Sequence, residues 1–93
     1  MQKVVIVGGG GHVGLPLALV LADSGFQAVS LDISKEAVDS INSGKMPFAE
    51  EGAEAILTKT LGNKSFYATM DHREIASAEI VIMTCSFCMR SSI

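Results

Sequence analysis

Residues 3–32 read KVVIVGGGGHVGLPLALVLADSGFQAVSLD, and this stretch decides the fold. Val4 to Val7 are consecutive β-branched residues, a run typical of a strand that is buried on both faces of a parallel sheet. After the glycines, the apolar run from about Val13 to Ser24 predicts a helix packed between two layers. Residues 27–32 then predict a second strand that ends in an acid.

The glycine turn contains the pattern Gly9-x-Gly11-x-x-Gly14. In a strand–turn–helix unit the first glycine permits the tight turn, the second lets the backbone approach a pyrophosphate, and the third lets the helix pack close to the strand. The amino end of the helix then faces the phosphates with its N–H groups and the positive end of its dipole. Asp32 follows after roughly 20 residues, where an acid binds the adenosine ribose.

A glycine turn alone is a weak signal, and the alternative is a tight strand–helix turn that binds nothing. Here a strand precedes the turn, a helix and a second strand follow it, and an acid ends that strand. This context favours a dinucleotide site. Because an anionic Asp32 would repel a 2′-phosphate, we expect NAD rather than NADP as the cofactor.

The rest of the chain continues the alternation of strands and helices. Ser34 is a candidate N-cap, Gly62-Asn63 is a candidate helix end, and Asp71-x-x-Glu74 resembles a capping box. The expected elements are helices at about 35–43, 53–61 and 71–78, and strands at 65–69 and 79–84, the last built on a buried apolar run. Right-handed crossovers then predict an α/β fold in which about four parallel strands, in the order 3-2-1-4, have helices on both faces.

Length and charge exclude several classes of protein. The 93 residues suffice for one small domain, and a net charge of −3 gives no electrostatic footprint for nucleic acid or an anionic membrane surface. No apolar run reaches the ~18 residues that a membrane helix needs, and the amino-terminal sequence does not resemble a secretory signal.

Two cysteines without such a signal favour a cytoplasmic location. Cys85-x-x-Cys88 lacks a second ligand pair, so two incidental thiols are favoured over a redox or metal site.

Several strings together resemble one known family. They are VGGGGHVGLPLA at 7–18, in which LPLA is more diagnostic than the glycines, LDI at 31–33, and PFAEEG at 47–52. On these residues the chain resembles the N-terminal NAD-binding domain of the UDP-glucose/GDP-mannose dehydrogenase family, and within it the UDP-N-acetyl-mannosamine-type enzymes.

The resemblance implies a partial Rossmann-type domain over residues 1–85. It further implies that a turn lines the NAD pyrophosphate and that Asp32 holds the ribose. The implied residues of that turn are Gly9, Gly11, His12, Val13 and Gly14. His12 stands where the family usually has tyrosine.

Residues 86–93 do not resemble the family, and we interpret them as an atypical tail of a truncated chain. The family oxidises the C6 alcohol of a nucleotide sugar with residues that lie well beyond position 93. We therefore assign no catalytic residue, expect no complete dehydrogenase activity from this chain alone, and expect the UDP-sugar as a partner only of the full-length enzyme.

With four strands, the fourth would be an exposed edge, so we expect a homo-oligomer joined through that strand or through the uncovered face. Two other functions remain open: a non-catalytic module that binds NAD or another adenine nucleotide, and an interaction domain that uses only the fold.

Overall fold

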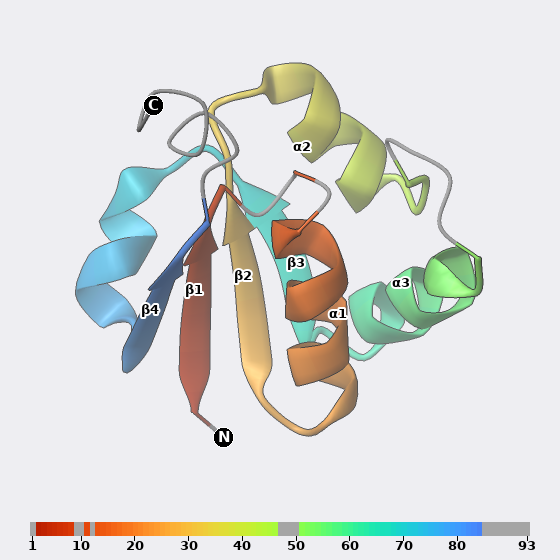
Figure 1. Ribbon diagram of the computed structural model, residues 1–93, viewed down its shortest axis with the longest axis horizontal. Coiled ribbons are helices and arrows are strands. Elements are labelled where there is room, and N and C mark those ends of the chain that lie inside the picture. The colour runs from red at the N-terminus through yellow and green to blue at the C-terminus, as the bar shows by residue number, and fades with distance from the viewer. Residues whose placement is uncertain (1, 9–10, 12, 47–50, 85–93) are drawn as a thin grey trace, which may run out of the picture.

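The centre of the molecule is a parallel sheet of four strands, seen in a computed structural model that describes residues 2–8, 11, 13–46 and 51–84 (Figure 1). The strands are β1 (Lys3–Val7), β2 (Gln27–Leu31), β3 (Phe66–Thr69) and β4 (Ile80–Met83). Their order is β3-β2-β1-β4, and every pair is parallel. The predicted strand order and fold class are therefore confirmed.

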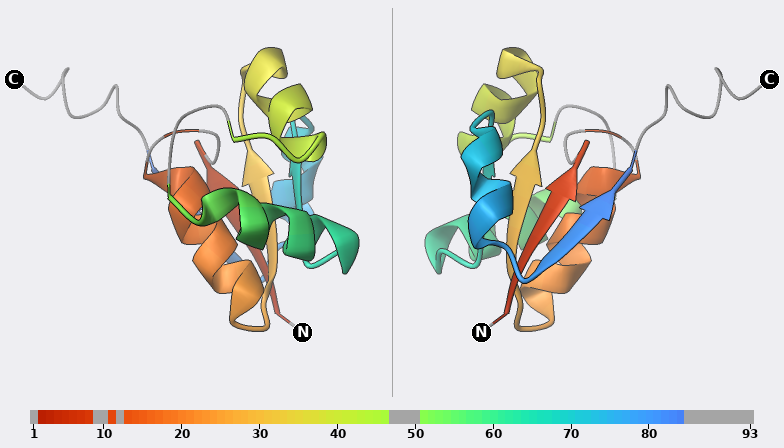
Figure 2. Two further views of the ribbon diagram at one scale, coloured as in Figure 1. Left: turned by 90° about the vertical axis from the view of Figure 1, so that its right-hand side faces the viewer. Right: turned by 90° about the vertical axis from the view of Figure 1, so that its left-hand side faces the viewer.

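In the described part of the chain, three α-helices cover one face of the sheet, and a single 3₁₀-helix lies on the other (Figure 2). The first group comprises α1 (Gly14–Asp23), α2 (Lys35–Asn42) and α3 (Ala53–Gly62), and the 3₁₀-helix is η1 (His72–Ser77). The strand order explains this distribution. The chain moves in one direction from β1 through β2 to β3 and then returns to β4, so a right-handed crossover must place the last connection on the opposite face.

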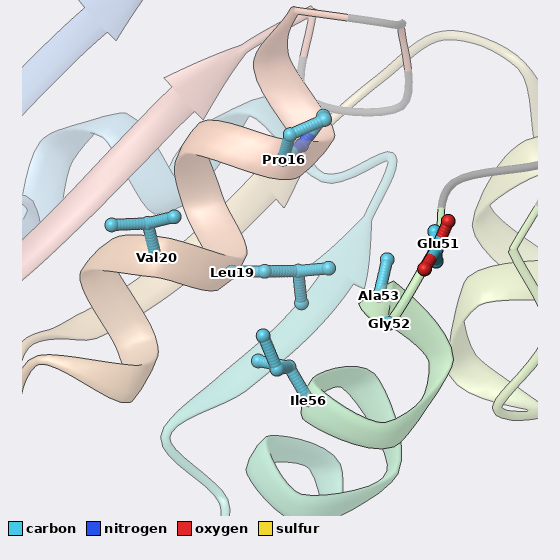
Figure 3. A pocket seen from close by; sticks show the side chains of 7 residues that line it. All are labelled: Pro16, Leu19, Val20, Glu51, Gly52, Ala53 and Ile56. Atoms are coloured by element: carbon cyan, nitrogen blue, oxygen red, sulfur yellow. The ribbon is translucent and has the colours of Figure 1, made fainter.

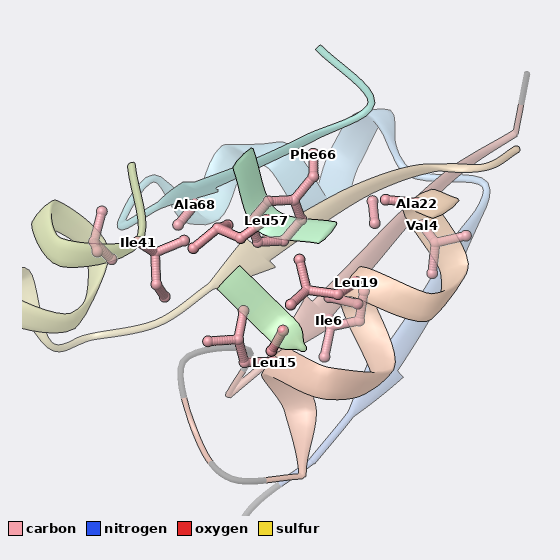
Figure 4. Packing of buried hydrophobic residues seen from close by; sticks show 13 residues of the cluster. Val4, Ile6, Leu15, Leu19, Ala22, Ile41, Leu57, Phe66 and Ala68 are labelled. Carbon is pink, nitrogen blue, oxygen red and sulfur yellow. The ribbon is translucent and has the colours of Figure 1, made fainter. Parts of the chain in front are cut away.

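The larger core lies between the sheet and the three α-helices (Figure 4). Along β1, Val4 and Ile6 belong to this core, whereas Val5 belongs to a smaller cluster under η1. These three side chains are at most 2% exposed, whereas Val7 at the end of the run is half-buried. The predicted burial on both faces is thus confirmed for Val4 to Ile6. The larger core also contains Leu15, Ala18, Leu19, Ala22, Ala28, Val38, Ile41, Ala53, Leu57, Phe66 and Ala68.

The helix ends follow local chemistry, with one difference from expectation. Ser34 caps α2 as predicted, because its Oγ accepts a hydrogen bond of 3.2 Å from the Ala37 amide. Helix α3 does not stop before Gly62. It includes Gly62 as its last residue, has Asn63 as its C-cap, and is followed by Lys64 in the left-handed region with φ of 65°.

One prediction about the last elements was wrong, and another was right only in part. The apolar run of β4 is not buried: Ile80 and Val81 are each 41% exposed and Met83 is 77% exposed. β4 pairs with β1 on one side and forms an edge of the described sheet, so it lacks the second neighbour that would bury it. The predicted short helix is a 3₁₀-helix, and Asp71 caps it as predicted, because its carboxylate accepts a 3.0 Å hydrogen bond from the Arg73 amide. Glu74 directs its carboxylate at Lys3 and does not complete a capping box.

The predicted atypical tail at 86–93, together with Cys85 and Cys88, lies outside the described residues, so the expected domain boundary near residue 85 stays a prediction.

Candidate functional site

The candidate site lies where the carboxyl ends of β1 and β2 meet, beside the point at which the strand order reverses. Gly8 directly follows β1, and its amide donates a 2.8 Å hydrogen bond to the carbonyl of Leu31 at the end of β2. The next residue is Asp32, whose amide donates to the Thr69 carbonyl at 3.1 Å. Gly8 and Asp32 are 24 residues apart in the sequence. The sheet thus brings the glycine turn and the acid together at the carboxyl ends of its strands. Crevices at such reversal points bind ligands in open α/β sheets.

The Asp32 carboxylate also helps to order the residue that caps α2. One of its oxygens, Oδ1, accepts a 2.9 Å hydrogen bond from the Ser34 amide, and Ser34 in turn caps α2. The side chain is half-buried. Two carboxylate oxygens offer about four acceptor positions, so a carboxylate held in this way suits a sugar diol that donates two hydrogen bonds.

Gly8 is a glycine that the fold itself requires, and the sequence analysis gave it no role. Its φ of +81° disfavours any other residue, and a Cβ added there would lie 2.1 Å from the carbonyl oxygen of Thr84. The close approach of the β4 end to the turn explains this requirement. The position of Gly8 directly after a strand was the available signal, whereas its contact with Thr84, 76 residues later, is not visible in the sequence.

Gly11 joins the turn to α1. Its amide donates to the Gly8 carbonyl at 3.2 Å, and its carbonyl accepts the Leu15 amide at 3.0 Å. A Cβ on Gly11 would meet only the Gly8 oxygen, at 3.5 Å, an ordinary van der Waals contact. The packing of the described protein therefore leaves room for a side chain at Gly11, in contrast to Gly8.

The remaining predicted site residues fall into two groups. Gly14 is the buried first residue of α1, and Val13 precedes it with 62% of its surface exposed. The first turn of α1 contains no acidic residue, so nothing there opposes an anion. Gly9 and His12 lie outside the described residues. The glycine turn, the start of a helix and an acid on the next strand together fit a dinucleotide.

The family comparison agrees with this geometry. The family model for the UDP-glucose/GDP-mannose dehydrogenase family, NAD binding domain, matches residues 2–89. The chain belongs to this family. NAD is accordingly the cofactor of the domain type that the chain contains.

Named relatives of the family share most of this chain. GDP-mannose 6-dehydrogenase of Pseudomonas putida is 36% identical over 75 residues, which are 81% of this chain and 17% of that protein. UDP-glucose 6-dehydrogenase 5 of Oryza sativa subsp. japonica is 31% identical over 86 residues, 90% of this chain and 18% of that protein. The crystal structure of a ternary complex of GDP-mannose dehydrogenase from Pseudomonas aeruginosa has a TM-score of 0.84 at 26% identity, covering 92% of this chain and 20% of that chain. The chain thus spans less than a fifth of the length of these curated relatives.

A cavity between α1 and α3 is separate from the candidate site at the carboxyl ends of β1 and β2 (Figure 3). Its volume is about 190 Å³, and Glu51 is the charged residue of its lining. The other lining residues are apolar or glycine: Pro16, Leu19, Val20, Gly52, Ala53 and Ile56. An apolar lining with one carboxylate does not suit a pyrophosphate, so the cavity is not where we place the cofactor.

Two further features bear on the family's chemistry. Among the described residues, no three histidine, cysteine, aspartate or glutamate side chains gather as a metal site would require. Within the same part of the chain, every helix is too short or too polar to cross a membrane.

Proposed function

We propose that this chain is the NAD-binding part of a nucleotide-sugar 6-dehydrogenase, and that its glycine turn and Asp32 bind the adenosine diphosphate half of NAD. The observation that carries the proposal is the 2.8 Å hydrogen bond between the Gly8 amide and the Leu31 carbonyl. This bond sets the turn beside the carboxylate at the reversal of the strand order, which is where a dinucleotide lies across such a sheet.

The pyrophosphate would lie against the turn formed by Gly9, Gly11, His12, Val13 and Gly14. The Leu15 amide is already bonded to the Gly11 carbonyl, and Pro16 has no amide hydrogen. We propose the amides of Val13 and Gly14, at the amino end of α1, as donors to the phosphates. When bound, NAD would accept a hydride, while this chain would hold and orient it.

Asp32 would accept hydrogen bonds from both hydroxyls of the adenosine ribose. A 2′-phosphate would place its negative charge against the same carboxylate, so the site favours NAD over NADP. Removing the carboxylate should weaken the binding of NAD and should also reduce the preference for NAD over NADP.

In the longer enzyme, the substrate would be a nucleotide sugar whose C6 alcohol is oxidised to a carboxylate with NAD as the hydride acceptor. We infer a UDP-N-acetyl-hexosamine of the mannosamine type, and activity assays with GDP-mannose and UDP-glucose as competing substrates test that preference. The same proposal includes a cytoplasmic location, a domain that ends near residue 85, and no complete dehydrogenase activity from this chain alone. Formation of NADH from NAD and a UDP-sugar by the purified chain would contradict the last point.

We also infer that the chain forms a homo-oligomer. The support is the exposure of Ile80, Val81 and Met83 on the edge strand β4, because an apolar strand edge favours pairing with another chain.

Calorimetric titration with NAD and ADP-ribose tests the nucleotide site. Gly11→Ala, and more strongly Gly11→Val, should weaken both ligands by about tenfold or more, since even one good phosphate hydrogen bond is worth roughly 1.5 kcal/mol. The fold should persist in Gly11→Ala, because its Cβ makes only an ordinary contact at 3.5 Å.

Two further variants complete the titration. Asp32→Ala should weaken NAD by roughly threefold to tenfold and reduce discrimination against NADP. Gly62→Ala is the matched control, because a Cβ there meets nothing within 4 Å and Gly62 lies at the far end of α3. Unchanged affinity in both the Gly11 and Asp32 variants would refute the proposed site.

A further inference from the structure

A threonine that follows β4 is hydrogen-bonded to the glycine turn. The Thr84 amide donates to the Val7 carbonyl at 2.8 Å, which continues the pairing of β4 with β1. The Thr84 hydroxyl lies 3.0 Å from the Val7 carbonyl and 3.3 Å from the Gly8 carbonyl, so its one proton is shared between them. The side chain is half-buried, and no role was predicted for it from the sequence.

The Gly8 carbonyl is therefore held from two directions. The Thr84 hydroxyl approaches it from β4, and the Gly11 amide donates to it at 3.2 Å from within the turn. Because a peptide is planar, the direction of a carbonyl also sets the plane of the peptide that follows. Through Gly11, whose carbonyl accepts the Leu15 amide, the same contacts connect to the start of α1.

A turn made largely of glycine has few side chains with which to hold its shape, and glycine has more conformational freedom than any other residue. Bonds from outside the turn therefore matter for its order. Resting on the proposed function, we propose that Thr84 is a positioning residue for pyrophosphate binding: its hydroxyl holds the Gly8 carbonyl and so pre-organises the turn that receives the phosphates. Pre-organisation strengthens binding by lowering the ordering cost that the ligand would otherwise meet.

The hydroxyl can be separated from the rest of Thr84. The hydrogen bond from the Thr84 backbone amide to the Val7 carbonyl involves no side-chain atom, and neither does the packing of the Thr84 carbonyl oxygen against Gly8. Both contacts should therefore persist in the variants compared below. Loss of the hydroxyl removes its contacts with the Val7 and Gly8 carbonyls, where β1 leads into the turn, and should leave the backbone pairing of β4 with β1 intact.

The test compares Thr84→Ser with Thr84→Ala, two variants that differ by the hydroxyl. Calorimetry with NAD and with ADP-ribose should give Thr84→Ser an affinity within about twofold of the unaltered chain, and Thr84→Ala an affinity about threefold to tenfold weaker, the effect of one neutral hydrogen bond. If Thr84→Ala does not fold, Thr84→Val replaces it, because valine keeps the shape without the hydroxyl.

Thr60 provides the matched control. Its hydroxyl lies 2.8 Å from the Ile56 carbonyl and 3.2 Å from the Leu57 carbonyl, both within α3. Thr60→Ala should melt at a lower temperature than Thr60→Ser, with equal NAD affinity in the two. A change in affinity that follows melting temperature in both pairs would reduce Thr84 to a structural role and overturn the inference.

The remaining outcomes separate the two proposals. Equal NAD affinities of Thr84→Ser and Thr84→Ala, in a chain that binds NAD, would overturn the role of Thr84 and leave the proposed function standing. Failure of the unaltered chain to bind either NAD or ADP-ribose would overturn both.

Discussion

At the scale of single residues, Ser30 is out of place in the centre of the sheet. Its side chain is fully buried on β2, and its Oγ is the buried side-chain polar atom without a hydrogen-bond partner within the described part of the chain. A buried hydroxyl that has lost water and gained no partner costs roughly 1–3 kcal/mol. Ser30→Ala should therefore raise the free energy of unfolding by about 1 kcal/mol, which chemical denaturation would measure.

Ser65 is the matched control for Ser30. It is also buried, but its hydroxyl is bonded to the Asn63 side chain, so Ser65→Ala should lower the free energy of unfolding. A loss of stability in Ser30→Ala of the same size as in Ser65→Ala would show that the Ser30 hydroxyl has a partner after all.

Residue-scale reasoning also explains what the sequence could say of the site. The spacing of Gly11, Gly14 and Asp32 is local information, and it correctly placed the turn and the acid on adjoining elements. The constraint on Gly8 and the contact of Thr84 with it could not be read in this way. Each is constrained by the other across 76 residues of chain, and only the pairing of β1 with β4 brings them together.

At the scale of elements, Glu74 of η1 contacts two side chains of the sheet. Its carboxylate accepts from the Lys3 ammonium at 2.6 Å and from the Tyr67 hydroxyl at 3.0 Å, and the Lys3 and Glu74 side chains are only 18% and 22% exposed. The hydrogen bond from Lys3 lowers the pKa of Glu74, and the same bond raises the pKa of Lys3. Desolvation raises the pKa of Tyr67, with Glu74 adding to it.

These shifts predict a pH dependence of stability. A carboxyl whose pKa is lower in the folded state contributes stability above its ordinary pKa, which is near 4.5, and loses it as the pH falls through the folded value. The raised pKa of Lys3 acts at the other end: its contribution is complete below its ordinary value of 10.5 and is lost as the pH rises through the folded value.

Glu74→Gln should therefore lower the free energy of unfolding by about 0.5–1 kcal/mol near neutral pH, and the difference should vanish in acid. Thermal unfolding of both proteins from about pH 3 to pH 8 measures this. Asp39→Asn, which breaks the exposed ion pair with Lys35 inside α2, should have a smaller effect. A deficit in Glu74→Gln that persists unchanged below the ordinary carboxyl pKa would contradict the ion pair as its cause.

Element-scale patterns predicted strand order and helix positions well, because apolar periodicity and caps act within a few residues. They failed for β4 and Glu74. The apolar run at 80–83 looks like a buried strand, but burial depends on neighbours that an isolated pattern does not reveal. Asp71-x-x-Glu74 looks like a capping box, but Lys3, distant in the chain, offers the carboxylate a charged partner.

At the scale of the whole molecule, the two faces and two edges of the sheet are covered unequally. Among the residues that the structure describes, three α-helices bury one face and only η1 lies on the other, and at the β4 edge Ile80, Val81 and Met83 are exposed. An edge strand of this kind offers a row of backbone donors and acceptors beside apolar side chains. We expect a second copy to pair there, so the mass measured by light scattering should rise with concentration above that of one 9.8 kDa chain.

Val81→Lys should return the chain to the monomer, because an ammonium group on an edge strand opposes pairing with an apolar neighbour. Ile33→Lys is the matched control: it replaces a side chain that is 92% exposed on the loop between β2 and α2, remote from the β4 edge, and should leave the association unchanged. A single-chain mass at every concentration for the unaltered protein would refute self-association. Equal masses for the two lysine variants would place the contact somewhere other than β4.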